Sequence, residues 1–322
     1  MSAELESVLD RRRLRRSLSV WRGAAIAGLA LGVGALAVGS EKLASFVGER
    51  QIARVTIEGT ILDDRAELKL LKKIGESKYV QGVLLFVNSP GGTTAGGESL
   101  YEALRELAEK KPIVAQFGTV AASAAYIAGL GTDHIVSRGN TITGSVGVLA
   151  QWPEVSELLG KLGVKMNEVK SGVLKASPSP FKPMDEGSRQ VMQASIDDGF
   201  RWFLGLVETR RGIRASDVPG LVDGRIYSGR EALTHKLVDE IGGENEAVKW
   251  LEDKRGLTKD LKVVDWKPER EGAWGLTSAI AGLFRGMLGL GPEILSDWVN
   301  QTPALATLGL DGLVSVWHPA EK

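Results

Sequence analysis

The spacing of apolar positions from residue 51 onward switches repeatedly between the period of a strand and that of a helix. Residues 52–58 alternate apolar and polar positions, which predicts a strand. Residues 80–87 are almost continuously apolar, as in a parallel strand that is covered on both faces. Between them, residues 65–77 place apolar side chains every three or four positions, which predicts an amphipathic helix.

The same alternation continues along the chain as far as residue 254. It predicts strands at 112–117, 134–137 and 145–149, and helices at 97–110, 153–162, 185–211, 229–235 and 245–254, with another helix beginning at Ser123. Repeated strand–helix alternation implies an α/β layer fold with a largely parallel sheet.

The N-terminal part of the chain has a different pattern. Residues 23–40 form an uncharged run of 18 residues, about the length that a helix needs to cross a bilayer core. Six arginines precede the run within residues 11–22, which by the positive-inside bias places residues 1–22 in the cytoplasm and the rest of the protein outside it. We therefore expect an uncleaved transmembrane anchor, with a cleaved signal peptide as the main alternative and a buried core helix as the other.

Composition narrows the chemistry that the chain can perform. Its 322 residues contain 40 basic and 40 acidic side chains, so the sequence gives no sign of general nucleic-acid binding. It contains no cysteine, which excludes disulfides, thiolate nucleophiles and thiolate metal sites. The three histidines, at positions 134, 235 and 318, are poorly placed for a catalytic triad, and we expect neither a metal nor a cofactor. Residues 266–322 are rich in glycine, leucine and tryptophan, and their role is not assigned.

Ser123 is the strongest candidate for a nucleophile. It lies among alanines where a predicted strand turns into a helix, so a substrate backbone could approach its hydroxyl closely. The free N–H of Ala124 at the start of that helix could then bind an oxyanion. An isolated serine in such a turn is more often an ordinary helix cap.

Two further segments could complete this chemistry. The turn-forming residues 89–92 follow the buried strand at its carboxyl end, where α/β folds place ligand sites, and the N–H of Gly92 could be a second oxyanion donor. A tight loop is the alternative explanation. Lys175 could act as the base if apolar surroundings lower its pKa, and Ser145 could hold the amine, although most lysines are simply solvated.

The order of these motifs resembles peptidase family S49, the signal peptide peptidases of SppA type. The similarity covers roughly residues 52–255 and includes the segments Ser89–Gly92, Ala121–Ser123, Thr143–Gly147, Ser171–Lys175, Ser179–Lys182, Asp223–Gly229 and Glu231–Gly242. The resemblance implies that Ser123 is the nucleophile and Lys175 the general base. It also implies that Ser145 positions the lysine and that the N–H groups of Gly92 and Ala124 form the oxyanion hole.

The resemblance also implies a wider set of properties. These are a ClpP/crotonase-like spiral of ββα units behind one transmembrane helix, a peptidase domain at residues 51–265, and assembly into a homo-oligomeric ring or dome. The resemblance further implies a single-pass protein of the bacterial inner membrane, with its catalytic domain outside the cytoplasm. The implied activity is cleavage of remnant signal peptides and other apolar peptides, without a cofactor.

The sequence departs from the family pattern at two places. Ala124 and Ala125 stand where glycines usually follow the nucleophile, and Ala176 stands where an aspartate often follows the base. If position 124 required a positive φ, alanine would be strained there. Two other functions therefore stay open: a non-catalytic membrane scaffold on a degenerate protease fold, and a crotonase-type acyl-CoA enzyme.

Overall fold

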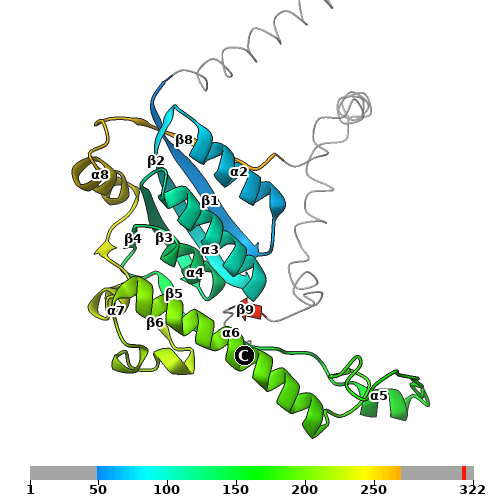
Figure 1. The fold of residues 1–322 in the computed structure, drawn as a ribbon. Coiled ribbons are helices and arrows are strands. Elements are labelled where there is room, and N and C mark those ends of the chain that lie inside the picture. The colour runs from blue at the N-terminus through cyan, green and yellow to red at the C-terminus, as the bar shows by residue number, and fades with distance from the viewer. Residues whose placement is uncertain (1–48, 270–313, 317–322) are drawn as a thin grey trace, which may run out of the picture. The chain divides into compact units, whose positions relative to one another are not determined.

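The computed structural model describes residues 49–269 and 314–316, and within it residues 51 onward form one structural unit (Figure 1). The predicted anchor at 23–40, the basic N-terminus and most of the extension at 266–322 lie outside the described residues. No helix among the described residues is both long and apolar enough to cross a membrane.

A mixed sheet, mostly parallel, forms the centre of this unit (Figure 1). Six of its strands run in the order β6-β5-β3-β2-β1-β8, while β4 pairs with β3 and β7, and β9 pairs with β2. Among the strands that the structure describes, only the β5–β6 and β2–β9 pairs are antiparallel. The strands are β1 (Gln51–Ile61), β2 (Val80–Thr93), β3 (Ile113–Ala122), β4 (His134–Ser137), β5 (Ile142–Gly144), β6 (Ile226–Ser228), β7 (Glu240–Ile241), β8 (Lys262–Asp265) and β9 (Val314–Val316).

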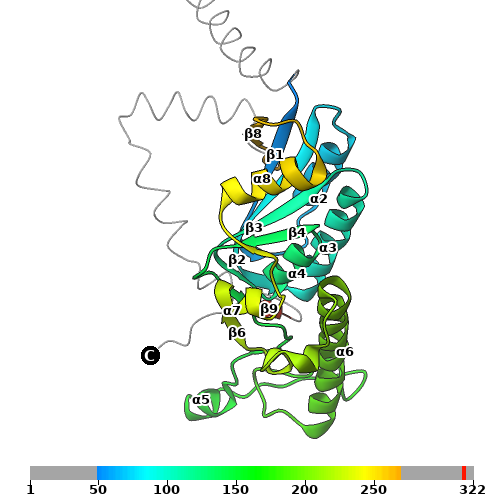
Figure 2. The ribbon, with the colours of Figure 1, turned by 90° about the vertical axis from the view of Figure 1, so that its left-hand side faces the viewer.

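Helices cover both faces of the sheet (Figure 2). One face packs against α2, α3, α4 and part of α6, and the other against α8. The helices are α2 (Arg65–Glu76), α3 (Thr94–Ala108), α4 (Ala124–Leu130), α5 (Ser156–Lys161), α6 (Glu186–Arg211), α7 (Gly229–Thr234) and α8 (Glu244–Arg255). The predicted α/β fold with a largely parallel sheet is confirmed.

The apolar run of β2 shows why this sheet forms. Val83 and Leu85 point into the larger core with α2 and α3, whereas Leu84 points into the smaller core with α8, and all three are fully buried. Successive side chains of a strand face opposite sides, so only a strand covered on both sides needs this unbroken apolar sequence.

Three predicted elements differ from the structure. The turn expected at residues 89–92 is instead extended chain, because β2 continues to Thr93 and keeps pairing with the end of β1. The strand expected at 145–149 is wrong: β5 ends at Gly144, and residues 145–148 are irregular. The helix expected at 153–162 is reduced to the six residues of α5, none of which is buried.

Candidate active site

Ser123 occupies a strained turn between β3 and α4. Its φ of 60° and ψ of −125° lie in a region that residues with a side chain rarely adopt, and such strain costs about 1–3 kcal/mol. The residue stands at the N-cap position of α4, but its side chain makes no capping hydrogen bond to that helix, and it is almost fully buried. An ordinary helix cap therefore does not account for Ser123, because the chain tolerates strain there without gaining the capping bond.

Strand β5 holds this turn in place. Its residues pair in parallel with the end of β3, and the buried Thr143 hydroxyl donates a 2.6 Å hydrogen bond to the carbonyl of Ala121. The Ser123 N–H donates to the carbonyl of Gly144 at 2.8 Å. The motif Thr143–Gly147 thus fixes the backbone that leads into the candidate nucleophile.

Ser145 belongs to that motif and is also strained, with a φ of 50°. Its N–H donates to the carbonyl of Arg225 at 3.0 Å, which anchors it to the segment before β6. Five non-glycine residues of the described chain have a positive φ, and three of them are Ser123, Ser145 and Ala176, the residue after Lys175. Backbone strain often occurs at functional sites, so these positions are candidates for experiment, and their roles stay predictions.

The two alanines after Ser123 fit their positions. Ala124 and Ala125 begin α4, neither has a positive φ, and both are fully buried. The first N–H groups of a helix have no acceptor within the helix, so the N–H of Ala124 suits an oxyanion donor as well as glycine would. Ala124 is therefore free of the backbone strain that a positive φ would impose on it.

Gly92 lies where β1 and β2 approach too closely for any side chain. A Cβ on Gly92 would come within 1.8 Å of the Ile61 carbonyl oxygen. The neighbouring Ser89 hydroxyl donates to the carbonyl of Gly59 at 2.6 Å and accepts the N–H of Gly91 at 3.1 Å. These contacts keep the segment 89–93 extended, at the carboxyl end of β2, where an oxyanion donor was predicted.

Ser123 and Ser145 line one pocket of about 430 Å³. Its walls combine apolar side chains with an amide and two carboxylates. The other lining residues are Val146, Gly147, Val148, Leu149, Gln193, Ile196, Asp197, Phe200, Val222, Asp223 and Gly224. The contribution of α6 was missed from the sequence, because a helical period shows which residues share a face but not that the face borders a site.

Lys175 lies outside this pocket in the isolated chain. It is exposed, in a turn where its N–H donates to the carbonyl of Gly172 at 3.1 Å. Its neighbours Val173 and Leu174 are 83% and 48% exposed, so the described residues of the chain do not provide the apolar burial expected around the lysine. The structure therefore brings together Ser123 and Ser145, but not Lys175.

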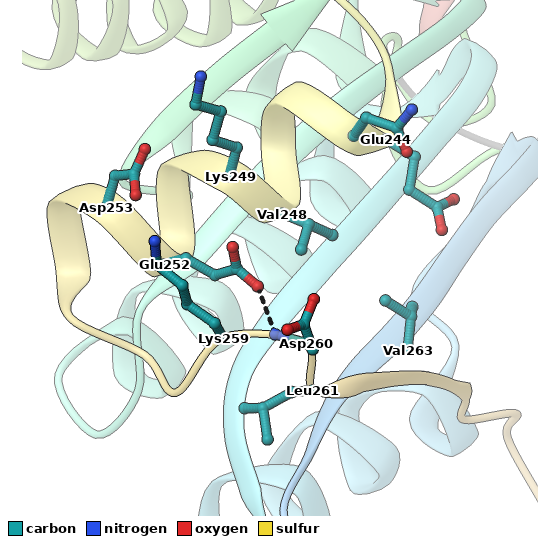
Figure 3. Close-up of a pocket in the computed structure, with 10 residues that line it drawn as sticks. Glu244, Val248, Lys249, Glu252, Asp253, Lys259, Asp260, Leu261 and Val263 are labelled. Carbon is teal, nitrogen blue, oxygen red and sulfur yellow. Dashed lines mark hydrogen bonds between the residues drawn. The ribbon is translucent and has the colours of Figure 1, made fainter.

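A different pocket lies between α8 and β8, at the far edge of the sheet (Figure 3). It has a volume of about 590 Å³ and is lined by charged side chains of both signs, and the Glu252 carboxylate accepts the N–H of Asp260 at 2.9 Å. It contains none of the predicted catalytic residues. His134 lies outside the candidate site and has a structural role, because its ring stacks on Trp250 with centroids 4.7 Å apart.

A strained, buried serine at the carboxyl end of a parallel strand, followed at once by a helix, is the arrangement of a serine hydrolase on an α/β fold. Comparison with known proteins identifies the family within this class of enzyme. Peptidase family S49 matches residues 105–258. A putative protease of Synechocystis, slr0021, is 35% identical over 218 residues, which are 67% of this chain and 78% of that protein. The chain belongs to peptidase family S49 and is a serine peptidase of SppA type.

One further relative agrees with this assignment, and one solved structure gives a weaker match. The putative signal peptide peptidase SppA of Enterococcus faecium is 35% identical over 249 residues, or 72% of this chain and 71% of that protein. Among solved structures, a ClpP1 mutant of Listeria monocytogenes aligns with 61% of this chain and 94% of its own at a TM-score of 0.40 and 16% identity. At that TM-score the spiral of ββα units stays a prediction.

Proposed function

We propose that this chain is a membrane-anchored serine endopeptidase that uses a dyad of Ser123 and Lys175 to cleave remnant signal peptides and other apolar peptides. The observation that carries the proposal is the strained Ser123 turn, held by β5 so that Ser123 and Ser145 share one pocket. Membership of a serine peptidase family favours this function over a degenerate scaffold or an acyl-CoA enzyme.

The proposed reaction needs one base and two oxyanion donors. Neutral Lys175 takes the proton from the Ser123 hydroxyl as the Ser123 Oγ bonds to the peptide carbonyl carbon. The N–H groups of Gly92 and Ala124 stabilise the oxyanion, each by about 3 kcal/mol. The tetrahedral intermediate expels the amine, which takes the proton from Lys175. Water then hydrolyses the acyl-enzyme. Its oxygen bonds to the acyl carbon, one of its protons returns to the Ser123 Oγ, and the other stays with the acid product.

The pocket walls support apolar substrates. Val146, Val148, Leu149, Ile196 and Phe200 line the space next to Ser123, and burying an apolar side chain there is worth about 25 cal/mol per Å². The uncharged run at 23–40 would hold the enzyme at a bacterial inner membrane, with its peptidase domain outside the cytoplasm. The Enterococcus relative, named as a putative signal peptide peptidase, supports the same substrate class.

We also infer that the dyad forms only in a homo-oligomer, a ring or dome. Lys175 belongs to the segment between α5 and α6, which lies away from the sheet (Figure 1). That segment exposes Met166, Val169, Val173 and Phe181, and Val169 is completely exposed. Several exposed apolar side chains in one segment are typical of an interaction surface, and covering them would supply the low-dielectric surroundings that a neutral lysine needs.

The dyad is tested by single substitutions that keep the fold. We expect Ser123→Ala and Lys175→Ala each to lower kcat on a fluorogenic apolar peptide by at least about a thousandfold. Lys165→Ala, another exposed lysine of the same segment, is the matched control and should keep wild-type kcat. Equal activity in all four proteins would refute the dyad, and an inactive wild type on several apolar peptides would refute the peptidase function itself.

Mixing the two inactive variants tests the oligomer. If the lysine of one subunit serves the serine of another, Ser123→Ala and Lys175→Ala subunits that are dissociated and reassembled together regain part of the activity. No recovery in reassembled mixtures, with oligomer formation verified by light scattering, would contradict a dyad shared between subunits.

A further inference from the structure

A short C-terminal strand lies against the glycine-rich end of β2. β9 (Val314–Val316) runs antiparallel to it, with Val316 opposite Gly91, Ser315 opposite Gly92 and Val314 opposite Thr93 (Figure 1). This contact joins the otherwise unassigned C-terminal extension to the segment that carries the proposed oxyanion donor. More than 40 residues of chain separate β8 from β9, so the pairing is not a consequence of local sequence.

The edge of β2 that β9 takes can be identified from the sheet. At Gly91 and Gly92 one edge of β2 is already paired with Thr60 and Ile61 of β1. On the other edge, β3 pairs with β2 only as far as Ser89, opposite Ala121, and then turns into the Ser123 turn. β9 therefore occupies the edge that β3 has left, which is the edge on the side of the candidate nucleophile.

A peptide substrate would need this same edge. To place its carbonyl between Ser123 and Gly92, an extended peptide has to lie along Gly91–Thr93, where the strand offers one row of N–H and C=O groups. Those groups can pair with one partner strand at a time. The chain's own residues 314–316 and an extended substrate are thus mutually exclusive occupants.

We propose that Val314–Val316 is a built-in competitive inhibitor that pairs with the substrate-binding edge of β2 and has to leave before a peptide can bind. This inference rests on the proposed function, because it takes the edge beside Ser123 to be the substrate edge. A strand of three residues makes few hydrogen bonds, so it is displaced by a good substrate instead of blocking the enzyme permanently. If the strand is paired for about nine-tenths of the time, the apparent Kd of a peptide rises about tenfold.

The test uses prolines to remove the pairing from the full-length chain. Successive N–H groups of a strand point to opposite edges, so replacing both Val314 and Ser315 by proline removes one N–H that faces β2, whichever of the two it is. Replacing the same two residues by alanine keeps both N–H groups and is the matched control. Both pairs of substitutions are made in Ser123→Ala protein, so that no peptide is cleaved during the measurement.

The readout is the Kd of a fluorescent apolar peptide, measured by polarisation. We expect the proline variant to bind about three- to tenfold more tightly than the alanine variant and the Ser123→Ala parent. Hydrogen exchange at residues 91–93 should also become faster in the proline variant without peptide. Equal Kd values in the three proteins, no binding by the proline variant, or unchanged exchange would each overturn the proposal.

These measurements do not depend on catalysis. If wild-type enzyme cleaves no peptide but the proline variant binds peptide more tightly, the proposed function fails and the inhibitory strand stands. If wild-type enzyme cleaves peptides and the Kd values are equal, the inhibitory strand fails and the proposed function stands.

Discussion

The strain at Ser123 predicts that glycine is unusually well tolerated there. We compare Ser123→Ala with Ser123→Gly, so that the hydroxyl is absent from both proteins and only the Cβ differs. Glycine adopts a φ of 60° and a ψ of −125° without the steric cost of a side chain, so the change from alanine to glycine releases about 1–3 kcal/mol of backbone strain.

Ala122 provides the matched reference, because it is also fully buried and its φ is not positive. An ordinary replacement of alanine by glycine costs about 0.5–1 kcal/mol in chain freedom. It loses about another 0.8 kcal/mol from the buried methyl group. Ala122→Gly, made in the Ser123→Ala background, should therefore lower the free energy of unfolding by about 1.5 kcal/mol. The replacement at position 123 should cost about 1–3 kcal/mol less, which brings its net effect close to zero.

Urea unfolding of the three proteins, followed by tryptophan fluorescence and far-UV circular dichroism, measures both differences. The comparison is valid only if the three m-values agree, because equal m-values indicate equal surface exposure on unfolding. If glycine costs as much at position 123 as at position 122, the turn is not strained, and the argument that Ser123 is held in place for function loses its structural basis.

The structure makes three further predictions. Gly92→Ala forces a Cβ against the Ile61 carbonyl, so we expect a loss of at least about 3 kcal/mol in the free energy of unfolding and no measurable peptidase activity. Tyr126→Phe removes a 2.7 Å hydrogen bond to the Leu237 carbonyl and should lower the unfolding free energy by about 1–2 kcal/mol, with kcat nearly unchanged. The hydroxyl and the N–H of Ser188 both donate hydrogen bonds to the Asp185 carboxylate and lower its pKa. The ionised carboxylate therefore stabilises the fold fully above about pH 4, and this stabilisation is lost as the pH falls through the lowered pKa. Asp185→Asn should lack this acid-dependent loss of stability.

Each of these predictions has a result that would contradict it, and the first also has a matched control. Gly172→Ala adds a Cβ in open space of the isolated chain and should not lower its stability, and a wild-type-like Gly92→Ala would disprove the close approach of β1 and β2. Unchanged thermal stability in Tyr126→Phe would show that its buried hydroxyl does not help to anchor α4. If urea midpoints at pH 5 and pH 3 shift equally in Asp185→Asn and wild type, the cap of α6 is not the titrating group.

The regular elements were predictable because local patterns encode them. The apolar run of β2 reflects a strand that is buried on both faces, and the helical spacing of α2 reflects a helix that is buried on one face. The continuation of β2 through Ser89–Gly92 was missed, since a proline and two glycines normally indicate a turn. Glycine is needed at position 92 because the β1 backbone at Ile61 comes too close for a side chain, and these two residues are 31 positions apart in the sequence.

The candidate site was only partly predictable for the same reason. Ser123 and Ser145 line one pocket because β3 and β5 are neighbouring parallel strands whose ends lie together, whereas their catalytic roles stay a prediction. The position of Lys175 depends on how an exposed segment packs, and a sequence pattern does not specify that packing. The pairing of β9 with β2 joins parts of the chain more than 200 residues apart, and no local signal indicated it.

In the proposed mechanism, Ser123 is a nucleophile that Lys175 activates. Mass spectrometry after brief exposure to an activated ester of an apolar peptide tests it directly, because the acyl group stays on the attacking residue. We expect the wild type and Lys165→Ala to carry one acyl group on Ser123, Lys175→Ala to be acylated at least about a hundredfold more slowly, and Ser123→Ala to carry none. Acylation at another residue, or at the wild-type rate in Lys175→Ala, would contradict the claim.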